Sequence, residues 1–184
     1  LVKKIRNLNN EIPVILMGYY NSIFNMGIEE FISKCVQVGV DGLIIVDLQP
    51  EEDADLYDKT KENNIDLIRL ITPTTNKERL KTILNNASGF LYYVTVTGIT
   101  GQNSANLKEL ETSINLIRSE SNLPIVAGFG IKSRKDVENI SAFTDGVVVG
   151  SSIVNIIKDN ISDKKNMLEK IDLFTQDLKK GTGS

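Results

Sequence analysis

Pro124-Ile-Val-Ala-Gly-Phe-Gly130 and Gly146-Val-Val-Val-Gly-Ser-Ser152 are two short apolar runs that each end in a glycine-bearing turn. A third run, Phe90 to Val96, precedes Gly98-Ile-Thr-Gly101 in the same way. Glycine has no Cβ, so the main chain can turn sharply there and bring its N–H groups close to a ligand. The two later turns lead into predicted helices, whose first N–H groups suit a phosphate. We therefore expect three successive strand ends to form a phosphate-binding edge.

Strand-like and helix-like segments alternate along the chain, as in a parallel sheet with helical crossovers. The predicted strands are Val14–Met17, Gly42–Val46, Leu67–Ile71, Gly89–Val96, Ile125–Ala127 and Gly146–Val149. The predicted helices are Ile28–Val38, Glu51–Asn63, Lys77–Leu84, Leu107–Glu120 and Arg134–Phe143, with a longer helical tail from Ile153 onward. Converging phosphate-binding turns at the last strands are typical of a (β/α)8 barrel. The predicted fold class is therefore α/β, of the TIM-barrel type.

The number of strand–helix units is smaller than a closed barrel needs. About six of the eight units are recognisable, and the sequence opens inside a helical pattern at Leu1–Leu8. We expect residues 1–184 to form a single barrel domain that lacks its two N-terminal units, with an open six-stranded sheet as the alternative. Residues 181–184, Gly-Thr-Gly-Ser, are expected to be a frayed end or a cloning remnant.

The composition excludes several kinds of chemistry. The 184 residues contain no histidine, which rules out Ser/His and Cys/His nucleophile pairs and histidine-ligated zinc. A net charge of −3 argues against a nucleic-acid partner, and no apolar run is long enough to span a membrane. The single cysteine, Cys35, cannot form an internal disulfide and fits a reducing compartment, so we expect a cytoplasmic protein.

A series of motifs in a fixed order resembles one enzyme family. The motifs are Pro13-Val-Ile-Leu-Met-Gly-Tyr-Tyr-Asn21, Val40-Asp-Gly-Leu-Ile-Ile-Val-Asp47 with Glu51-Glu52, Tyr92 ahead of Thr97-Gly-Ile-Thr-Gly101, Gly128-Phe-Gly-Ile131, and Gly150-Ser-Ser-Ile153. The chain resembles tryptophan synthase α subunits from about their third barrel strand to the C-terminus. The resemblance implies cleavage of indole-3-glycerol phosphate to indole and glyceraldehyde 3-phosphate. It implies no cofactor on this chain and transfer of indole to a pyridoxal-phosphate-dependent β subunit in an α2β2 complex.

The resemblance also assigns residues to the two ends of the substrate. The phosphate is expected at Gly101, Gly130, Gly150 and Ser151, where Ser151 also suits the N-cap of a helix. The indole ring is expected against apolar or aromatic side chains at strand ends: Tyr92, Phe129, Leu70, Ile44 and Met17, with Thr100 nearby. Taken singly, most of these are more often plain core residues. Phe129 is the exception, because a large aromatic between two glycines is poorly placed to fill a core.

Asp47 ends an otherwise apolar strand, a position typical of a catalytic or ligand-binding carboxylate. A role in capping a helix or orienting a loop is the alternative, and the resemblance places Asp47 near the indole. The Glu and Asp that the family uses as its acid–base pair would lie upstream of Leu1, so no catalytic residue is predicted in this chain. Without that pair, residues 1–184 are expected to bind the phosphate end of the substrate without turning it over. Tyr19, Tyr20, Asn21 and Pro50 are expected to contact the β subunit.

Two other functions remain open from the residues alone. The first is another phosphate-binding barrel isomerase or synthase, for which Asp47 is the one visible strand-end acid or base. The second is an inactive partial barrel that binds phosphate, or that associates with itself to cover its exposed sheet edges.

Overall fold

The computed structural model describes residues 1–95, 104–128 and 130–183, without the side chains of Ser104 and Ala105. The chain divides into two compact units. The first unit comprises Leu1–Leu70 and Asn76–Leu91, and the second comprises Ile71–Thr75 and Tyr92–Ser184.

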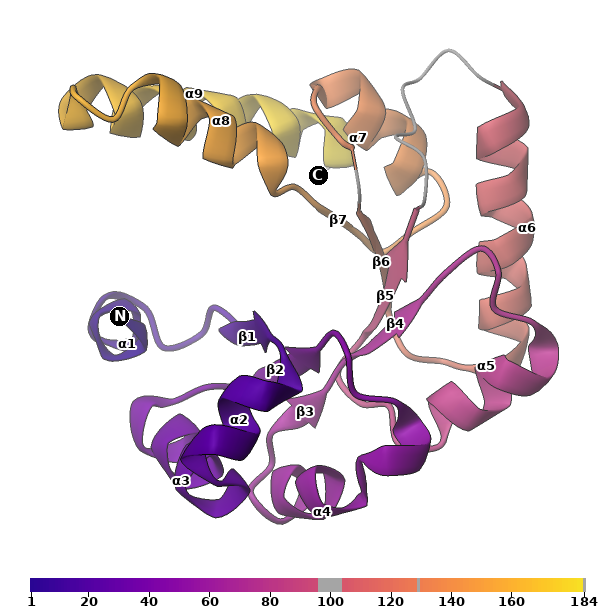
Figure 1. Cartoon of the computed structure of the whole chain (residues 1–184). Coiled ribbons are helices and arrows are strands. Elements are labelled where there is room, and N and C mark those ends of the chain that lie inside the picture. Colours follow the sequence, from indigo (N-terminus) through magenta and orange to yellow (C-terminus); the bar gives the residue numbers. More distant parts are fainter. Residues whose placement is uncertain (96–103, 129, 184) are drawn as a thin grey trace. The chain divides into compact units, whose positions relative to one another are not determined.

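The first unit is built on a three-stranded parallel sheet. The sheet has the order β1-β2-β3, with Ile15 opposite Gly42 and Leu43 opposite Leu67. Figure 1 shows α3 and α4 beside this sheet, where they cover a core centred on the fully buried Leu43. The elements of this unit are α1 (Val2–Leu8), β1 (Ile15–Gly18), α2 (Tyr20–Met26), α3 (Ile28–Val38), β2 (Gly42–Ile45), the 3-10 turn η1 (Pro50–Glu52), α4 (Ala54–Glu62), β3 (Asp66–Leu67) and α5 (Lys77–Leu84).

Local sequence explains where the best-defined helices of this unit begin and end. In α3, Ile28, Ile32 and Cys35 follow helical spacing and face the core, and Gly39 ends the helix with φ = +82°. In α5, the Asn76 side chain accepts a hydrogen bond from the main-chain N–H of Arg79, which caps the first turn.

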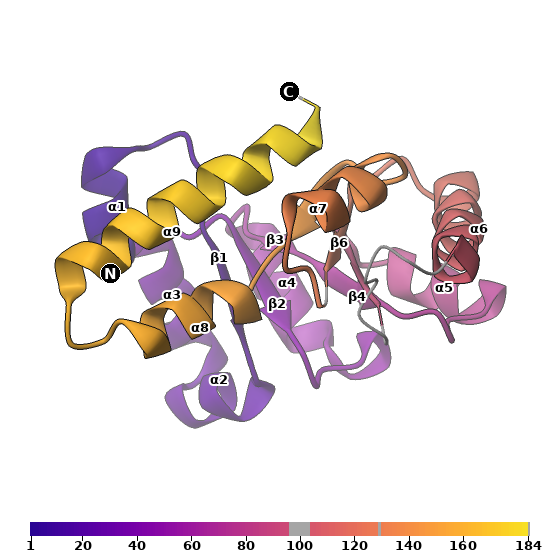
Figure 2. The same ribbon diagram turned by 90° about the horizontal axis from the view of Figure 1, so that it is seen from above.

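The second unit carries the later strands and helices. The second sheet has the order β4-β5-β6-β7, and the chain passes between the two units within β4 and within β5. Strands β6 and β7 are parallel neighbours, with Gly128 opposite Val148. Figure 2 shows α8 and α9 lying alongside each other. The remaining elements are β4 (Arg69–Ile71), of which only Ile71 belongs to this unit, β5 (Leu91–Val94), of which all but Leu91 belong to it, α6 (Ser104–Glu120), β6 (Ile125–Gly128), α7 (Arg134–Ser141), β7 (Gly146–Val148), α8 (Ser151–Asp159), α9 (Lys164–Lys179) and the 3-10 turn η2 (Lys180–Thr182).

The structure contains all six predicted strands with small changes at their ends. The strand predicted at 67–71 is divided at Ile68 into β3, which belongs to the first sheet, and β4, which belongs to the second. Helix α2 was not predicted. In the segment expected to be frayed, Gly181 is buried against the main chain of Arg134 and the side chain of Val137, whereas Thr182 and Gly183 are exposed. None of the described helices has the length and apolar character that a membrane span requires.

A polar clamp holds the first two strands at their amino ends. The carboxylate of Asp41, just before β2, accepts the N–H of Val14, just before β1, at 2.5 Å, and the Asp41 N–H donates to the Val14 carbonyl at 3.0 Å. The guanidinium of Arg6, on α1, pairs with the same carboxylate and donates to the Gly39 carbonyl at 2.8 Å. The carboxylate therefore fixes the register of two strands and ties them to a helix.

The second unit contains the same clamp at β6 and β7. The carboxylate of Asp145 accepts the Ile125 N–H at 2.8 Å, and the Asp145 N–H donates to the Ile125 carbonyl at 2.8 Å. Arg118, on α6, binds the carboxylate at 3.1 Å and the Phe143 carbonyl at 3.3 Å. The hydrogen bond from Ile125, followed by that from Arg118, lowers the pKa of Asp145.

Candidate functional site

Three of the four predicted phosphate ligands lie in two turns at one edge of the second sheet. Gly130 follows the end of β6 and has φ = +73°, a conformation that favours glycine. Gly150 is the N-cap of α8, and Ser151 is the first residue of that helix. The alternative N-cap role for Ser151 is thus taken by Gly150. Because β6 and β7 run parallel in register, both turns leave the sheet at the same edge.

A side-chain hydrogen bond joins the two turns. The Ser152 hydroxyl donates to the main-chain carbonyl of Ile131 at 2.9 Å. The first hydrogen bonds within α8 are donated by Ile153 and Val154 to the Gly150 carbonyl. The N–H groups of Ser151 and Ser152 therefore precede the bonded part of the helix and belong to its positive end. Exposed Ser151, the exposed turn at Gly150 and the Gly130 turn together form a surface suited to an anion.

Tyr92, a predicted indole contact, lies against β6 in the same unit. A Cβ built on Gly128 would stand 2.8 Å from the Tyr92 hydroxyl and 2.7 Å from the Val148 Cβ. Gly128 thus allows a close approach that no other residue would permit. Tyr92 is half-buried, and this burial raises the pKa of its hydroxyl. Gly101, Thr100 and Phe129, also predicted to bind substrate, lie outside the described residues.

The remaining apolar candidates lie in the first unit. Met17 and Ile44 are register partners on β1 and β2, so the structure places them side by side. Ile44 is buried, whereas Met17 is 58% exposed and offers apolar surface beside it. Leu70, on β4, is half-buried, and no described contact joins it to the other two. Substrate contact by these three side chains remains a prediction.

Asp47 stands two residues beyond β2, exposed, and orients a neighbouring helix. Its Oδ1 atom accepts the main-chain N–H of Tyr20 at 2.7 Å, at the start of α2. The N-cap residue of α2, Tyr19, makes no side-chain hydrogen bond to the helix. Asp47, which is distant in sequence, caps the first turn instead. This contact supports the loop-orienting alternative for Asp47 and leaves its nearness to the indole a prediction.

The predicted partner-binding residues differ in exposure. Tyr19 is 63% exposed and Asn21 is exposed. Tyr20 is half-buried, because its ring packs on the core and lies 6.1 Å from that of Phe24 between centroids. Pro50 is the first residue of η1 and is half-buried.

Phe24, which no sequence pattern singled out, is the most exposed aromatic residue among the described residues, at 67%. Phe24 lines an open hollow of about 520 Å3 together with Tyr20, Gly27, Ile28, Glu29, Glu30 and Asp55. The exposure of Phe24 could have been predicted only if the segment Tyr20–Met26 had been recognised as helix α2. Once Tyr20–Met26 is taken as a helix, Ile23 faces the core and its neighbour Phe24 faces outward.

A buried ion pair was also missed. Asp53, the residue before α4, pairs its carboxylate with the guanidinium of Arg69 on β4, and their side chains are 0% and 6% exposed. Burial lowers the pKa of Arg69 to about 10, so the guanidinium remains charged at neutral pH. The Asn86 amide also donates to Asp53, at 3.3 Å. This pair fixes the end of the loop that begins at Pro50.

A second arginine holds the outer part of the same loop. Arg79, on α5, binds the side chains of Gln49 and Glu51. The hydrogen bond from Arg79 lowers the pKa of Glu51, so this carboxylate stays ionised at neutral pH. The loop from 49 to 53 is therefore held by cations from two different elements.

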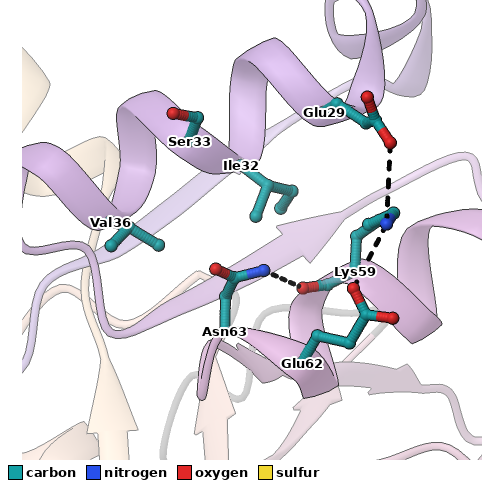
Figure 3. A pocket seen from close by; sticks show the side chains of 7 residues that line it. All are labelled: Glu29, Ile32, Ser33, Val36, Lys59, Glu62 and Asn63. Atoms are coloured by element: carbon teal, nitrogen blue, oxygen red, sulfur yellow. Dashed lines mark hydrogen bonds and ion pairs between the residues drawn. The ribbon is translucent and has the colours of Figure 1, made fainter.

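A further surface hollow of about 260 Å3 lies between α3 and α4 (Figure 3). Lys59 bridges Glu29 at 3.6 Å and Glu62 at 3.2 Å, and the bond to Glu62 is the main cause of the raised pKa of Lys59. No predicted substrate residue lines this hollow, whose residues are Glu29, Ile32, Ser33, Val36, Lys59, Glu62 and Asn63. Among the residues described, no three His, Cys, Asp or Glu side chains gather as a metal site would require.

Parallel strands alternating with helices, and polar or glycine turns at their carboxyl ends, define an α/β protein of the (β/α)8-barrel class with about six of the eight units. The model of the tryptophan synthase alpha chain family matches residues 1–183, and the chain belongs to this family. A tryptophan synthase alpha chain of Petrotoga mobilis is 44% identical in a match that covers 97% of this chain and 71% of the relative.

Solved structures agree with this assignment. Tryptophan synthase subunit alpha from Legionella pneumophila superposes with a TM-score of 0.88 at 34% identity, over 99% of this chain and 67% of that one. A chain of the tryptophan synthase a2b2 complex from Pyrococcus furiosus gives a TM-score of 0.84 at 30% identity, over 96% and 70%. A structure from Aquifex aeolicus, with a TM-score of 0.84 at 29% identity over 98% of this chain, is covered to 66% of its length. The chain thus spans about two thirds of these relatives. The family is that of a lyase of tryptophan biosynthesis.

Proposed function

We propose that this protein cleaves indole-3-glycerol phosphate to indole and glyceraldehyde 3-phosphate and passes the indole to a tryptophan synthase β subunit. The observation that carries the proposal is the joined pair of turns after β6 and β7. Gly130, Gly150 and Ser151 lie at one edge of the sheet, and the Ser152–Ile131 hydrogen bond links their two segments. Main-chain N–H groups at a helix start and at a glycine turn suit the substrate's phosphate. Gly101 is proposed as a further ligand by resemblance.

Each of the two units carries apolar side chains that suit contact with an indole ring. Tyr92 presents a half-buried ring beside Gly128, and Met17 presents exposed apolar surface beside Ile44. We propose these residues, with Leu70, Phe129 and Thr100, as the contacts of the indole. Within this proposal the two units belong to one barrel domain.

The chemistry of the cleavage requires positioned acids and bases. C3 of the indole must gain a proton while the indole N–H loses one. The bond from C3 to the glycerol carbon then breaks as the glycerol hydroxyl loses its proton to become the aldehyde, and the indole nitrogen regains a proton. Asp47 is bonded to the Tyr20 N–H and is proposed to orient the site. The acid–base pair is proposed to be the Glu and Asp that the family resemblance places upstream of Leu1.

The exposed aromatic surface of α2 supports the proposed partner. Tyr19 and Phe24 are 63% and 67% exposed, and large aromatic side chains are preferred anchors at protein interfaces. We propose that these residues, with Tyr20, Asn21 and Pro50, contact the β subunit of an α2β2 complex. Pyridoxal phosphate would then belong to the β subunit, this chain would need no cofactor, and the pair would work in the cytoplasm.

Two assays divide the proposal into binding and catalysis. Titration with indole-3-glycerol phosphate tests the phosphate-binding turns, and release of indole tests the cleavage, which depends on the pair expected upstream of Leu1. Ser151→Asp should abolish substrate binding, because it places a carboxylate where the phosphate would lie. A carboxylate at a helix start is itself favourable, so the fold should persist.

Ser162→Asp is the matched control, since Ser162 is exposed in the turn between α8 and α9. We expect it to bind substrate like the unmodified protein. Equal binding by Ser151→Asp would refute the phosphate assignment. Binding without indole release, even in a protein that carries the upstream acid and base, would favour the inactive phosphate-binding alternative.

A further inference from the structure

The peptide group between Ile131 and Lys132 is held at both of its polar ends. Its carbonyl accepts the Ser152 hydroxyl at 2.9 Å, and its N–H donates to Asp136 Oδ2 at 3.0 Å. A peptide group bonded on both sides cannot rotate without breaking one of the two bonds. This fixed group lies one residue beyond Gly130, so it restricts where the Gly130 turn can lie.

One of the two anchors belongs to α7. Asp136 is 7% exposed, and its Oδ2 atom also accepts the N–H of Ser133 at 3.0 Å and the Ser133 hydroxyl at 2.8 Å. Ser133 and Asp136 together form the capping box of α7. This anchor therefore fixes the peptide group to the helix that follows it in sequence.

The other anchor belongs to α8. Ser152 is half-buried in the first turn of α8, and Ile131 is 3% exposed. The hydroxyl bond spans 21 residues of sequence, and among the described contacts it is the hydrogen bond that connects the turn after β6 to the start of α8. The paired residues of the β6–β7 ladder end before both turns, at Gly128 and Val148.

We propose that Ser152 is a positioning residue for the phosphate site. It sets the distance between the Gly130 turn and the helix start at Gly150 and Ser151, so that N–H groups from both segments point to one anion. This inference rests on the proposed function, which assigns the phosphate to these turns. Ser152 acts through Ile131 and need not touch the phosphate.

The test compares two serines that make the same kind of bond. Ser152→Ala removes the hydroxyl bond to Ile131, and Ser119→Ala removes a hydroxyl bond of 2.7 Å to the Leu116 carbonyl, within α6. The measurement is the dissociation constant for inorganic phosphate, by isothermal titration, with the urea midpoint of each variant as the structural readout.

The expected result is a loss of phosphate affinity at Ser152 alone. We expect Ser152→Ala to raise the dissociation constant about fivefold, the factor that one ordinary hydrogen bond supplies. Ser119→Ala should leave it unchanged even if both urea midpoints fall. Ser152→Thr keeps a hydroxyl in the same position and should restore most of the affinity.

Other outcomes overturn the inference in distinguishable ways. Equal losses of affinity in Ser152→Ala and Ser119→Ala would mean general loosening of the unit. Unchanged binding by Ser152→Ala, together with lost binding by Ser151→Asp, would keep the phosphate site and remove the role of Ser152. No phosphate binding by the unmodified protein would overturn the site itself and this inference with it.

Discussion

The buried Arg69–Asp53 pair predicts a large and strongly coupled effect on stability. Both side chains are nearly or fully buried, so neutralising one partner leaves an uncompensated charge away from water. We expect Arg69→Met or Asp53→Leu alone to lower the free energy of unfolding by about 3–5 kcal/mol. Replacing both charges by apolar side chains removes the desolvation cost together with the attraction. The double variant should therefore lie within about 1–2 kcal/mol of the unmodified protein.

The assay is a double-mutant cycle in urea. Unfolding curves of the unmodified protein, the two single variants and the double variant give four free energies of unfolding. The coupling is the amount by which the summed losses of the two single variants differ from the loss in the double variant. We expect a coupling of at least about 4 kcal/mol, because the two single losses together far exceed the loss expected of the double variant. Arg79→Met is the comparison at the same loop. It breaks the more exposed Glu51 contact, and should cost clearly less.

Two results would refute the reasoning about this pair. Additive losses in the double variant would show that the side chains do not stabilise each other. A single-variant loss below about 1 kcal/mol, the size typical of an exposed ion pair, would show that Asp53 and Arg69 are hydrated rather than buried.

Three further outcomes are expected. Gly128→Ala should cost about 1–3 kcal/mol in urea unfolding, because its Cβ would meet the side chain and main chain of β7, while Gly18→Ala, with nothing within 4 Å, should cost clearly less; equal losses would contradict the close approach. Cys35 is 3% exposed and burial raises its pKa, so it should react with a thiol reagent far more slowly in the folded than in the urea-unfolded protein; equal rates would contradict its burial. The pKa of Asp145 is lowered in the folded protein, chiefly by the Ile125 N–H, so its stabilisation is present above about pH 4 and lost as the pH falls through the folded pKa. Asp145→Asn should therefore reduce the urea midpoint at pH 7 more than at pH 3, and a constant difference would contradict the shift.

Local sequence was sufficient to predict those helices whose caps and apolar spacing involve only residues within or next to the helix. The bounds of α3 and α5 are the predicted ones, because apolar positions recur at helical spacing and Gly39 and Asn76 mark their ends. Helix α2 was missed because it has only 7 residues, no side-chain cap of its own and, unlike α1, no charged side chain that marks a polar face. Its first N–H is bonded by Asp47, 27 residues away, which no local pattern reveals.

The same limit applies to the candidate site. Glycine turns after apolar runs predicted the positions of Gly130 and Gly150, because strand ends and helix starts are local features. The partners that hold these and neighbouring segments are distant in sequence. Ser152 binds a carbonyl 21 residues earlier, and the Arg69–Asp53 pair depends on which strands become neighbours. Their residue types are common at the surface, so only the fold distinguishes them from solvated side chains.

Because similar clamps occur at Asp41 in the first unit and at Asp145 in the second, the same substitution in each can test whether the two units unfold together. Each unit holds the register of one strand pair with the same set of bonds: an N–H, a carbonyl and an arginine from the preceding helix. Asp41→Asn and Asp145→Asn are therefore comparable perturbations applied to different units of one chain. If the chain unfolds as one cooperative body, both variants move a single shared transition. If the halves unfold independently, each variant moves its own transition, and the order of events can be assigned without any extrinsic label.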